Sequence, residues 1–417
     1  MRIKQTSTVL LAAILSSIFT ACNQPISSQV EEPGVTKGTI RLGSVLALQG
    51  QEEALGNHMK AGLEAAFKGE KVQGKTITIS FKNDFYEPST AEHGTEKLIN
   101  QGIFLMVGNV GTLTAQATLP ILERNNIPAV GFFSGAIFLR PGEGNIVNYR
   151  ASYAQEISAV VKFAQRIGLQ PQDICAYVQN DGYGMAGLAG LKQALVKAEA
   201  SEDIIKGYEA VMTISGEEAE RNNIASVGVY DHNTPYVKPG YDSLKNWEQK
   251  TGNRCKLVLT AGSYSNIARF AKHSQEQGET WVISALSFTG ADDFRLDLEE
   301  YGVKDRIIMT QVVPLLNSPL DIVREAKTEL GEKFGFVSLE GYIVGKMVLQ
   351  ILQDISGDLT RENFIAQMEK SKFNLGGLEI DFTKDGHQGS NLVIVSYLTP
   401  SGYQLLYLDT FRAMFSQ

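Results

Sequence analysis

The chain has 417 residues, of which 43% are hydrophobic and 20% charged, and its formal net charge is −8. A chain of this length and composition can form two or more domains, each with a hydrophobic core of its own. The acidic balance, with no basic run longer than two residues, argues against nucleic acid as a partner, because that binding rests on Lys and Arg contacts to phosphate.

Residues 1–21 are predicted to be a processing signal. Basic residues precede an apolar stretch at 9–19, which is too short to cross a membrane as a helix, and small residues lead to Cys22. This pattern resembles a bacterial lipoprotein signal, which is cleaved before a cysteine that carries lipid, so Cys22 is the expected lipidation site. An ordinary signal peptide with an incidental cysteine is the alternative. Residues 22–37 are polar and are interpreted as a tether.

From residue 39 onward, buried strands alternate with amphipathic helices. The first strands are expected at 39–48, 75–84, 103–109 and 128–133. The helices between them are expected at 57–67, at 89–100 with a helix cap at its start, and at 113–125.

The pattern then restarts with a second series of elements. Its strands are expected at 174–181, 255–262, 280–287 and 306–313, and its helices at 153–169 and 185–200 and near 265–277 and 293–301. Helices at 318–334, at 338–355 and after Thr360 follow, and the chain ends in a β-hairpin with its turn at 400–402. This alternation predicts an α/β fold with two doubly wound parallel sheets, each covered by helices on both faces.

Residues 214–254 interrupt this alternation of strands and helices. The segment is polar and rich in Gly, Pro and Asn, and it is longer than an ordinary loop. It is therefore predicted to be a surface excursion with local structure of its own.

The two cysteines in the body of the chain are Cys175 and Cys255, and each begins an apolar run. If these runs are neighbouring parallel strands, the two side chains lie side by side, and outside the cytoplasm such a pair can be oxidised to a disulfide. Two buried free thiols are the alternative. The sequence favours the free thiols, because bridges between adjacent strands fit disulfide geometry poorly.

Two glycine motifs are similar to nucleotide-binding loops. GYGMAG at 182–187 has the G-x-G-x-x-G pattern between a strand and a helix, in which a glycine backbone admits a pyrophosphate. Its place in the middle of an exported chain favours instead a tight turn that presents Tyr183. GYIVGKM at 341–347 lacks the Ser or Thr of a P-loop and is expected to pack within a helix.

No motif points to catalysis. The five histidines are scattered without metal-ligand spacing, and no G-x-S-x-G motif occurs. We therefore expect no enzyme activity, no metal and no cofactor. An exported dinucleotide-dependent enzyme that uses residues 182–187 is the alternative.

Five segments that follow predicted strands carry small residues that expose backbone N–H groups, and most add a hydroxyl or an aromatic ring: GNVGTLT, GFFSGA, NDGYG, AGSYSN and SALSFTGADD. Open α/β sheets bind ligands beyond the carboxyl ends of their strands. Two such edges facing each other would form a ligand-binding cleft.

From about Gly38 to its end, the chain resembles the type I periplasmic binding proteins of the branched-chain amino acid-binding (leucine-binding) group, the receptors of ABC importers. The landmarks are IRLGSVLALQGQEEALGNHMKAGLEAAF, GNVGTLTAQATLPILERNNIPAV, NYRASYAQE, YVQNDGYGMAGLAGLKQAL and VSLEGYIVGKMV. The resemblance implies two lobes that close on a ligand through three hinge crossings, near Arg150, Gln311 and Thr383. Lobe one would comprise 38–150 and 312–382, and lobe two 151–311 and 383–417.

The resemblance also implies ligand-binding residues in lobe one. The family's amino acid receptors hold the ligand's carboxylate there with a hydroxyl and backbone groups. The matching residues are Thr112, Phe133 and Gly135. Gly135 stands where a threonine is usual, so Ser134 is the expected substitute for the missing hydroxyl.

In lobe two, an aromatic residue of the family matches Tyr183, and another matches Ser263 or Tyr264. The acidic residue that pairs with the ligand's ammonium matches Ser287, and Phe288 beside it would wall the apolar part of the ligand. A buried ammonium without a carboxylate partner is unfavourable. A free α-amino acid is therefore expected only if Asp181 or Glu340 supplies the charge.

These expectations together describe a lipid-anchored, monomeric solute receptor in the periplasm or on the cell surface. It would capture a small polar or aromatic-containing ligand, such as an amino acid or a related compound, and deliver it to an ABC permease in the inner membrane. A ligand sensor for a membrane kinase or chemoreceptor is the alternative, because it needs the same closure of two lobes.

Overall fold

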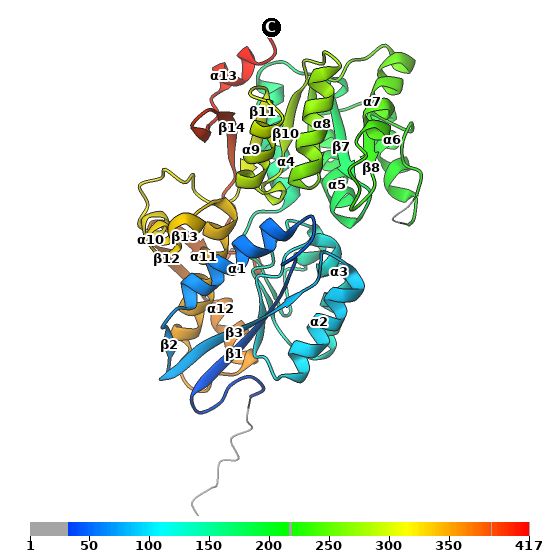
Figure 1. The fold of residues 1–417 in the computed structure, drawn as a ribbon. Coiled ribbons are helices and arrows are strands. Elements are labelled where there is room, and N and C mark those ends of the chain that lie inside the picture. The colour runs from blue at the N-terminus through cyan, green and yellow to red at the C-terminus, as the bar shows by residue number, and fades with distance from the viewer. Residues whose placement is uncertain (1–31, 217–218, 385, 417) are drawn as a thin grey trace, which may run out of the picture. The chain divides into compact units, whose positions relative to one another are not determined.

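The computed structural model describes residues 32–216, 219–384 and 386–416 (Figure 1). The predicted signal at 1–21 and Cys22 lie outside the described residues, and of the tether only 32–37 are described. Within the described part of the chain, no helix is long and apolar enough to cross a membrane. The described residues belong to one compact unit with two mixed, mostly parallel sheets and a separate two-stranded hairpin.

The first sheet has six strands in the order β2-β3-β1-β4-β5-β6. Their bounds are β1 Thr39–Leu46, β2 Lys71–Val72, β3 Lys75–Asn83, β4 Leu105–Val107, β5 Ala129–Val130 and β6 Ile146–Val147. All neighbours are parallel except β2 and β3. The expected strand at 128–133 is reduced to two residues, because Gly131 has a φ of 60° and interrupts it; Phe133 still forms an isolated parallel bridge with Val110.

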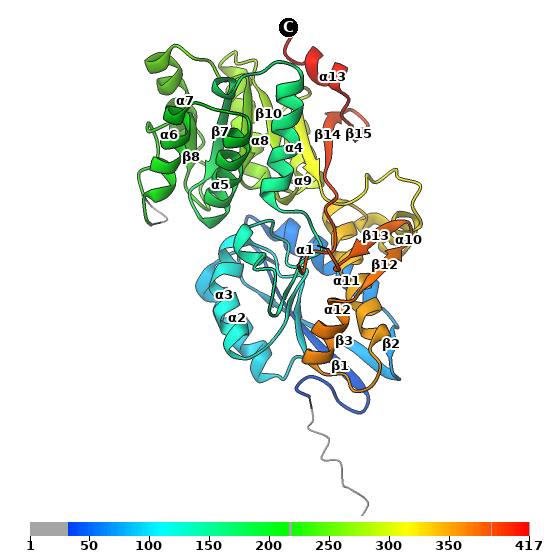
Figure 2. The same ribbon diagram turned by 180° about the vertical axis from the view of Figure 1, so that it is seen from behind.

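Helices cover both faces of this sheet. One face carries α1 (Glu53–Phe67) and α11 (Phe336–Asp354), and the other carries α2 (Pro88–Asn100) and α3 (Thr112–Arg124) (Figures 1 and 2). Side chains of a strand alternate between the two faces. Accordingly, Leu42 and Leu46 of β1 join the core that contains α1, whereas Val45 joins a separate core with α2 and α3.

Glycines let α1 and α11 pack backbone against backbone. A Cβ atom on Gly62 would lie 2.2 Å from the carbonyl oxygen of Ser338, and one on Gly345 would lie 2.4 Å from the Cβ of Ala66. The GYIVGKM motif therefore serves helix packing, as predicted.

The second sheet has seven strands in the order β15-β14-β11-β10-β9-β7-β8. Their bounds are β7 Ile174–Gln179, β8 Val227–Tyr230, β9 Leu257–Ala261, β10 Val282–Ala285, β11 Ile307–Gln311, β14 Ile394–Thr399 and β15 Gly402–Leu405. The strands β8, β7, β9, β10 and β11 are parallel, and β14 and β15 extend the sheet in antiparallel order. The expected C-terminal hairpin is thereby confirmed.

Helices again cover both faces of the second sheet, so the expected doubly wound α/β fold is confirmed (Figure 2). The helices are α4 Tyr153–Arg166, α5 Gly182–Lys197, α6 Glu202–Thr213, α7 Lys238–Thr251, α8 Tyr264–Glu276 and α9 Ala291–Glu300. A capping box between Ser152 and Gln155 starts α4 and satisfies two backbone N–H groups that the helix itself leaves unpaired.

The chain passes between the two sheets three times: after β6, after β11, and between the hairpin β12–β13 and β14. These passages lie near the expected crossings, and the lobe boundaries themselves stay a prediction. The remaining elements are α10 Asp321–Leu330, α12 Arg361–Met368, β12 Lys372–Leu375, β13 Leu378–Asp381, α13 Leu408–Ala413 and short 3-10 turns at Ile137–Leu139, Pro171–Asp173, Ser287–Thr289 and Gly331–Lys333.

Two local predictions are wrong. Residues 214–254 have the expected local structure, but they are not a surface excursion, because β8 pairs with β7 as a parallel edge strand and α7 follows it, which continues the alternation. The four apolar or small residues of β8 were hidden in a polar segment. The start of α2 also differs: it begins at Pro88, and its N-cap residue Glu87 makes no side-chain cap hydrogen bond.

Cys175 and Cys255 form a disulfide, with Cα atoms 5.6 Å apart. The disulfide, which was one of the two alternatives, is therefore confirmed, and the prediction of free thiols, which the sequence favoured, is wrong. Cys175 lies in β7, but Cys255 precedes β9 by two residues and is not paired in the ladder. The bridge therefore avoids the unfavourable geometry of two directly paired strand residues, and its Cα separation is ordinary.

Candidate functional site

The structure places the sequence-predicted site residues at the carboxyl ends of strands from both sheets. Thr112 follows β4 and begins α3, and Phe133 follows β5. Tyr183 lies in the first turn of α5 after β7, Ser263 precedes α8 after β9, and Ser287 follows β10. These side chains are all nearly inaccessible to solvent, whereas Tyr264 is half-buried.

Three hydroxyl groups meet beside β5. The Thr112 Oγ1 lies 2.8 Å from Ser134 Oγ and 3.1 Å from the hydroxyl of Tyr153, within hydrogen-bond distance of both. A Cβ on Gly135 would lie 2.4 Å from the Tyr153 ring. The glycine is therefore required for the close approach of the Tyr153 ring, whose hydroxyl lies beside those of Thr112 and Ser134. Sequence reasoning missed Tyr153, although it lies in the NYRASYAQE landmark.

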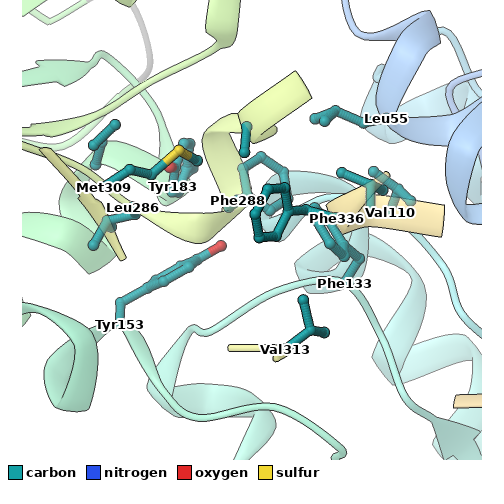
Figure 3. Close-up of a cluster of buried hydrophobic side chains, with 14 of the residues drawn as sticks. Leu55, Val110, Phe133, Tyr153, Tyr183, Leu286, Phe288, Met309, Val313 and Phe336 are labelled. Atoms are coloured by element: carbon teal, nitrogen blue, oxygen red, sulfur yellow. The ribbon is translucent and has the colours of Figure 1, made fainter. Parts of the chain in front are cut away.

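Aromatic rings pack around Phe288 (Figure 3). The ring centroids of Tyr183 and Phe133 lie 4.5 and 5.3 Å from that of Phe288, and those of Tyr153 and Tyr86 each lie 6.4 Å away. A cavity beside Phe133 and Ser287 measures about 10 Å³, which is about the space of one water molecule. Aromatic side chains from segments of both sheets thus fill the space between these strand ends.

Phe132 does not belong to this cluster. Its side chain lies in the core between the first sheet and the helices α2 and α3. Successive residues of an extended chain point to opposite sides, so Phe133 alone faces the aromatic cluster.

Ser287 is surrounded by a buried charge cluster. Arg150 donates to Ser287 Oγ, and the Ser287 backbone N–H donates to Glu156 Oε2 over 2.9 Å. The guanidinium also lies 3.6 Å from a carboxylate oxygen of Glu156 and 3.6 Å from one of Glu340. The position that matches the family's ammonium-binding acid is therefore flanked by two carboxylates that already share one internal cation. Sequence reasoning named Glu340 as a possible source of charge and Arg150 only as the position of a hinge crossing, and it missed Glu156.

Burial and charge act against each other in this cluster. Burial disfavours the charged form of Arg150, but the carboxylates of Glu340 and Glu156 outweigh it and raise its pKa. Burial raises the pKa of Glu340 to about 7, and Arg150 opposes that rise. The guanidinium also lies 4.6 Å from the centroid of the Phe133 ring, a cation–π contact.

Asp181 caps α5. Its Oδ1 accepts hydrogen bonds from the backbone N–H groups of Tyr183, at 2.9 Å, and Gly184, at 3.1 Å. These N–H groups are the ones that a pyrophosphate would need. A Cβ on Gly184 would lie 1.8 Å from the carbonyl oxygen of Gln179, so the glycine is explained by close packing of strand and helix.

We expect Gly184→Val to unfold the second sheet locally rather than to abolish a nucleotide site. The valine side chain would collide with backbone, and overpacking of this kind costs about 1–3 kcal/mol or more. Urea denaturation should show a lower midpoint, and NAD should not shift the melting temperature of the unchanged protein. A folded variant that has lost NAD binding would contradict this expectation.

A second group of polar residues surrounds His232, whose ring lies next to that of Tyr86. The His232 ring is 5.2 Å from the Tyr86 ring, its Nδ1 is 3.4 Å from Asp181 Oδ2, and its Nε2 is 3.8 Å from Glu87 Oε1. Burial disfavours a charge on His232, but the hydrogen bond to Asp181 and the nearby carboxylates outweigh it and raise its pKa. Glu52 lies in the same region, and burial raises its pKa to about 7.

The raised pKa of Glu52 makes stability depend on pH. The folded carboxyl holds its proton up to about pH 7, whereas the unfolded one releases it near 4.5, so stability falls as the pH rises between these values. We expect Glu52→Gln to raise the free energy of unfolding by about 3 kcal/mol at pH 8 and to change little at pH 4. Urea denaturation at both pH values measures this, and an equal effect at both would be the contrary result.

This α/β fold, with two mixed, mostly parallel sheets, is the one seen in structures of type I periplasmic binding proteins. The chain belongs to the periplasmic binding protein family, whose family model matches residues 39–402. The expected type I periplasmic binding protein resemblance is thereby confirmed, and the family consists of solute-binding proteins that are not enzymes. Among curated proteins, none matches this sequence significantly.

Solved structures agree with this assignment. A possible leucine/isoleucine/valine-binding protein from Rhodopirellula baltica SH 1 is 28% identical, with a TM-score of 0.79 over 89% of this chain and 97% of that one. Two others share the fold at lower identity. They are a fatty acid ABC transporter substrate-binding protein from Thermomonospora curvata (16% identity, TM-score 0.73, 90% and 93% covered) and a solute-binding protein from R. palustris in complex with 4-hydroxybenzoate (15%, 0.69, 88% and 96%).

Proposed function

We propose that the protein captures a small polar or aromatic-containing ligand between two lobes and delivers it to an ABC importer. The ligand would be an amino acid or a related compound. One observation carries the proposal: segments that follow strands of both sheets converge on one buried cluster of hydroxyl groups and aromatic rings. Closure of two lobes buries most of a small ligand, and a few placed polar groups then set its specificity.

The similar structures support a solute receptor and leave the ligand open. One is a possible leucine/isoleucine/valine-binding protein, another is a fatty acid ABC transporter substrate-binding protein, and the third is in complex with 4-hydroxybenzoate. All of these compounds combine a polar head with an apolar body. The hydroxyl groups of Thr112, Ser134 and Tyr153 would bind such a head, and the rings of Phe133, Tyr183 and Phe288 would pack on such a body.

A panel of compounds tests the proposal. The mature chain without lipid, refolded once to remove carried-over ligand, is melted with branched and aromatic amino acids, their amides, aromatic acids, polyamines and NAD. A ligand at 100 times its dissociation constant stabilises by about 2.7 kcal/mol, so a true ligand raises the melting temperature. If no compound does so, the proposed function fails.

The hydroxyl cluster provides a matched pair of variants for any ligand found. Thr112→Val removes the central hydroxyl at nearly constant volume, and we expect about a fivefold loss of affinity, because a buried hydrogen bond contributes about 1 kcal/mol. Thr78→Val, on the exposed side of β3, is the control and should bind normally. Equal affinities of the two variants would remove Thr112 from the site.

The anchor is part of the same proposal. We propose that Cys22 carries lipid after cleavage of residues 1–21 and holds the protein at the membrane. Cys22→Ser should release the protein into the soluble fraction. Stimulation of a partner permease's ATPase by the liganded protein would separate the importer role from that of a sensor.

A further inference from the structure

We propose that Glu52 binds a cationic group of the ligand, so that the ligand class is a small organic cation with an aromatic or apolar body. This inference rests on the proposed function and deepens it. It places the ligand's positive charge at the N-terminus of α1 and not at Ser287, where the family's amino acid receptors have their acid.

Glu52 is held where segments of both sheets meet. It is the N-cap residue of α1, and its backbone oxygen accepts hydrogen bonds from Leu55 and Gly56. The preceding residue, Gln51, accepts a hydrogen bond of 2.6 Å from the hydroxyl of Tyr264, in the first turn of α8. Gln51 also donates to the backbone oxygen of Asn233 over 3.1 Å. The backbone at Glu52 is therefore fixed against the second sheet's loops.

Several buried polar atoms around Glu52 are left without a partner. Glu52 is 3% exposed and does not cap its own helix through its side chain. Its Oε2, the hydroxyl of Tyr86 and the Oγ of Ser263 have no hydrogen-bond partner among the described residues. Buried polar atoms in native proteins are nearly always paired. Three such atoms in one place, a carboxyl oxygen and two hydroxyl groups that can each donate or accept, indicate a binding site for a polar group of a ligand.

The charges in this region favour a cation. The carboxylates of Asp181 and Asp293 raise the pKa of Glu52, and His232 is the cation that lowers it. Glu87 lies next to His232 and adds a further carboxylate to the region. Helix N-termini generally attract anions, and at the N-terminus of α1 the carboxyl group of the N-cap residue Glu52 is the anionic group in that position. An anionic ligand group would meet more carboxylates than cations. An ammonium or guanidinium would instead meet the Glu52 carboxyl, whose Oε2 has no hydrogen-bond partner among the described residues.

Aromatic rings next to Glu52 suit the same ligand class. Tyr86 lies close enough to Glu52 that its pKa is affected by the Glu52 charge, although burial is the main reason that this pKa is raised. Tyr86 in turn contacts Phe288, which contacts Tyr183. Ring faces attract cations, and aromatic clusters are a common way of binding organic ammonium groups. A cation at Glu52 would therefore have an apolar surface beside it for the rest of the ligand.

Three probes with one ring and different end groups test this inference: tyramine carries an ammonium, tyrosol a hydroxyl and 4-hydroxyphenylacetate a carboxylate. Calorimetry with the mature chain at pH 7 is expected to show binding of tyramine at least tenfold tighter than of the other two. Because bound cation favours the ionised carboxyl, tyramine binding should also release a fraction of a proton, which titrations in phosphate and Tris buffers reveal.

Variants assign the effect to Glu52. Glu52→Gln should weaken tyramine at least tenfold, abolish the proton release and leave tyrosol unchanged. The control Glu53→Gln makes the same charge change on the neighbouring exposed residue and should leave all three probes unchanged. If Glu52→Gln fails to fold, Glu52→Asp, which keeps the charge, should retain the preference for tyramine.

The outcomes separate this inference from the proposed function. Tighter binding of the carboxylate or of the neutral probe, or tyramine binding that Glu52→Gln does not weaken, would overturn the inference and leave a solute receptor. If the three probes do not bind, the wider panel decides. A cation from it whose binding needs Glu52 supports the inference, and an anionic or neutral ligand overturns it. Binding of no compound overturns both.

Discussion

Arg150→Met is expected to lower the free energy of unfolding by about 3–5 kcal/mol, because it leaves buried carboxylates without their cation. Arg150 and Glu156 are 1% and 0% exposed, and Glu340 is 2% exposed. The side chain of methionine fills much of the same volume, so lost packing is a minor part of the effect. Urea denaturation at pH 8, above the pKa of about 7 of Glu340, should show the full loss.

Two further variants isolate the charge from the packing. Arg166→Met removes a surface arginine from α4 and should change stability by less than about 0.5 kcal/mol. The triple variant Arg150→Met, Glu156→Gln, Glu340→Gln removes the buried charges together and should recover much of the loss, because buried ion pairs are often no more stabilising than neutral replacements. Full stability of Arg150→Met alone would show that the guanidinium is not needed to neutralise the cluster.

Loss of the Cys175–Cys255 disulfide is the second large effect that we expect. The bond closes a loop of 80 residues in sequence, and the chain-entropy model assigns about 4 kcal/mol to a loop of this length. The double variant Cys175→Ala, Cys255→Ala should therefore unfold at a lower urea concentration than the oxidised protein. Alanine at both positions avoids a free thiol that could pair with another chain.

A reductant provides the control for the disulfide. It should lower the urea midpoint of the unchanged protein toward that of the double variant and should not affect the double variant itself. Two free thiols in the purified, exported protein, detected by mass spectrometry after alkylation, would be the contrary result. The sequence favoured free thiols only because adjacent strands were assumed to pair the two cysteines directly. Cys255 instead lies before its strand, which the apolar run did not reveal.

Local patterns determined most of the fold. Apolar runs such as 39–48 and 174–181 contain the strands β1 and β7, and the 57–67 helix pattern lies within α1. These elements are encoded by the period of their own apolar residues, so they can be recognised without their neighbours. β8 was missed because an edge strand of four residues within a polar segment has too short a pattern.

The sequence by itself determined which segments reach the candidate site, because parallel strands place their carboxyl ends at one edge of a sheet. The tertiary structure decided what these segments meet. Tyr153 occupies the space beside Gly135, Arg150 lies between two glutamates, and the charge of Glu52 acts on Tyr86. These pairs are far apart in sequence or come from different sheets. Charge, burial and unpaired hydrogen-bonding groups arise only when the two sheets' loops come together, and no local pattern encodes them.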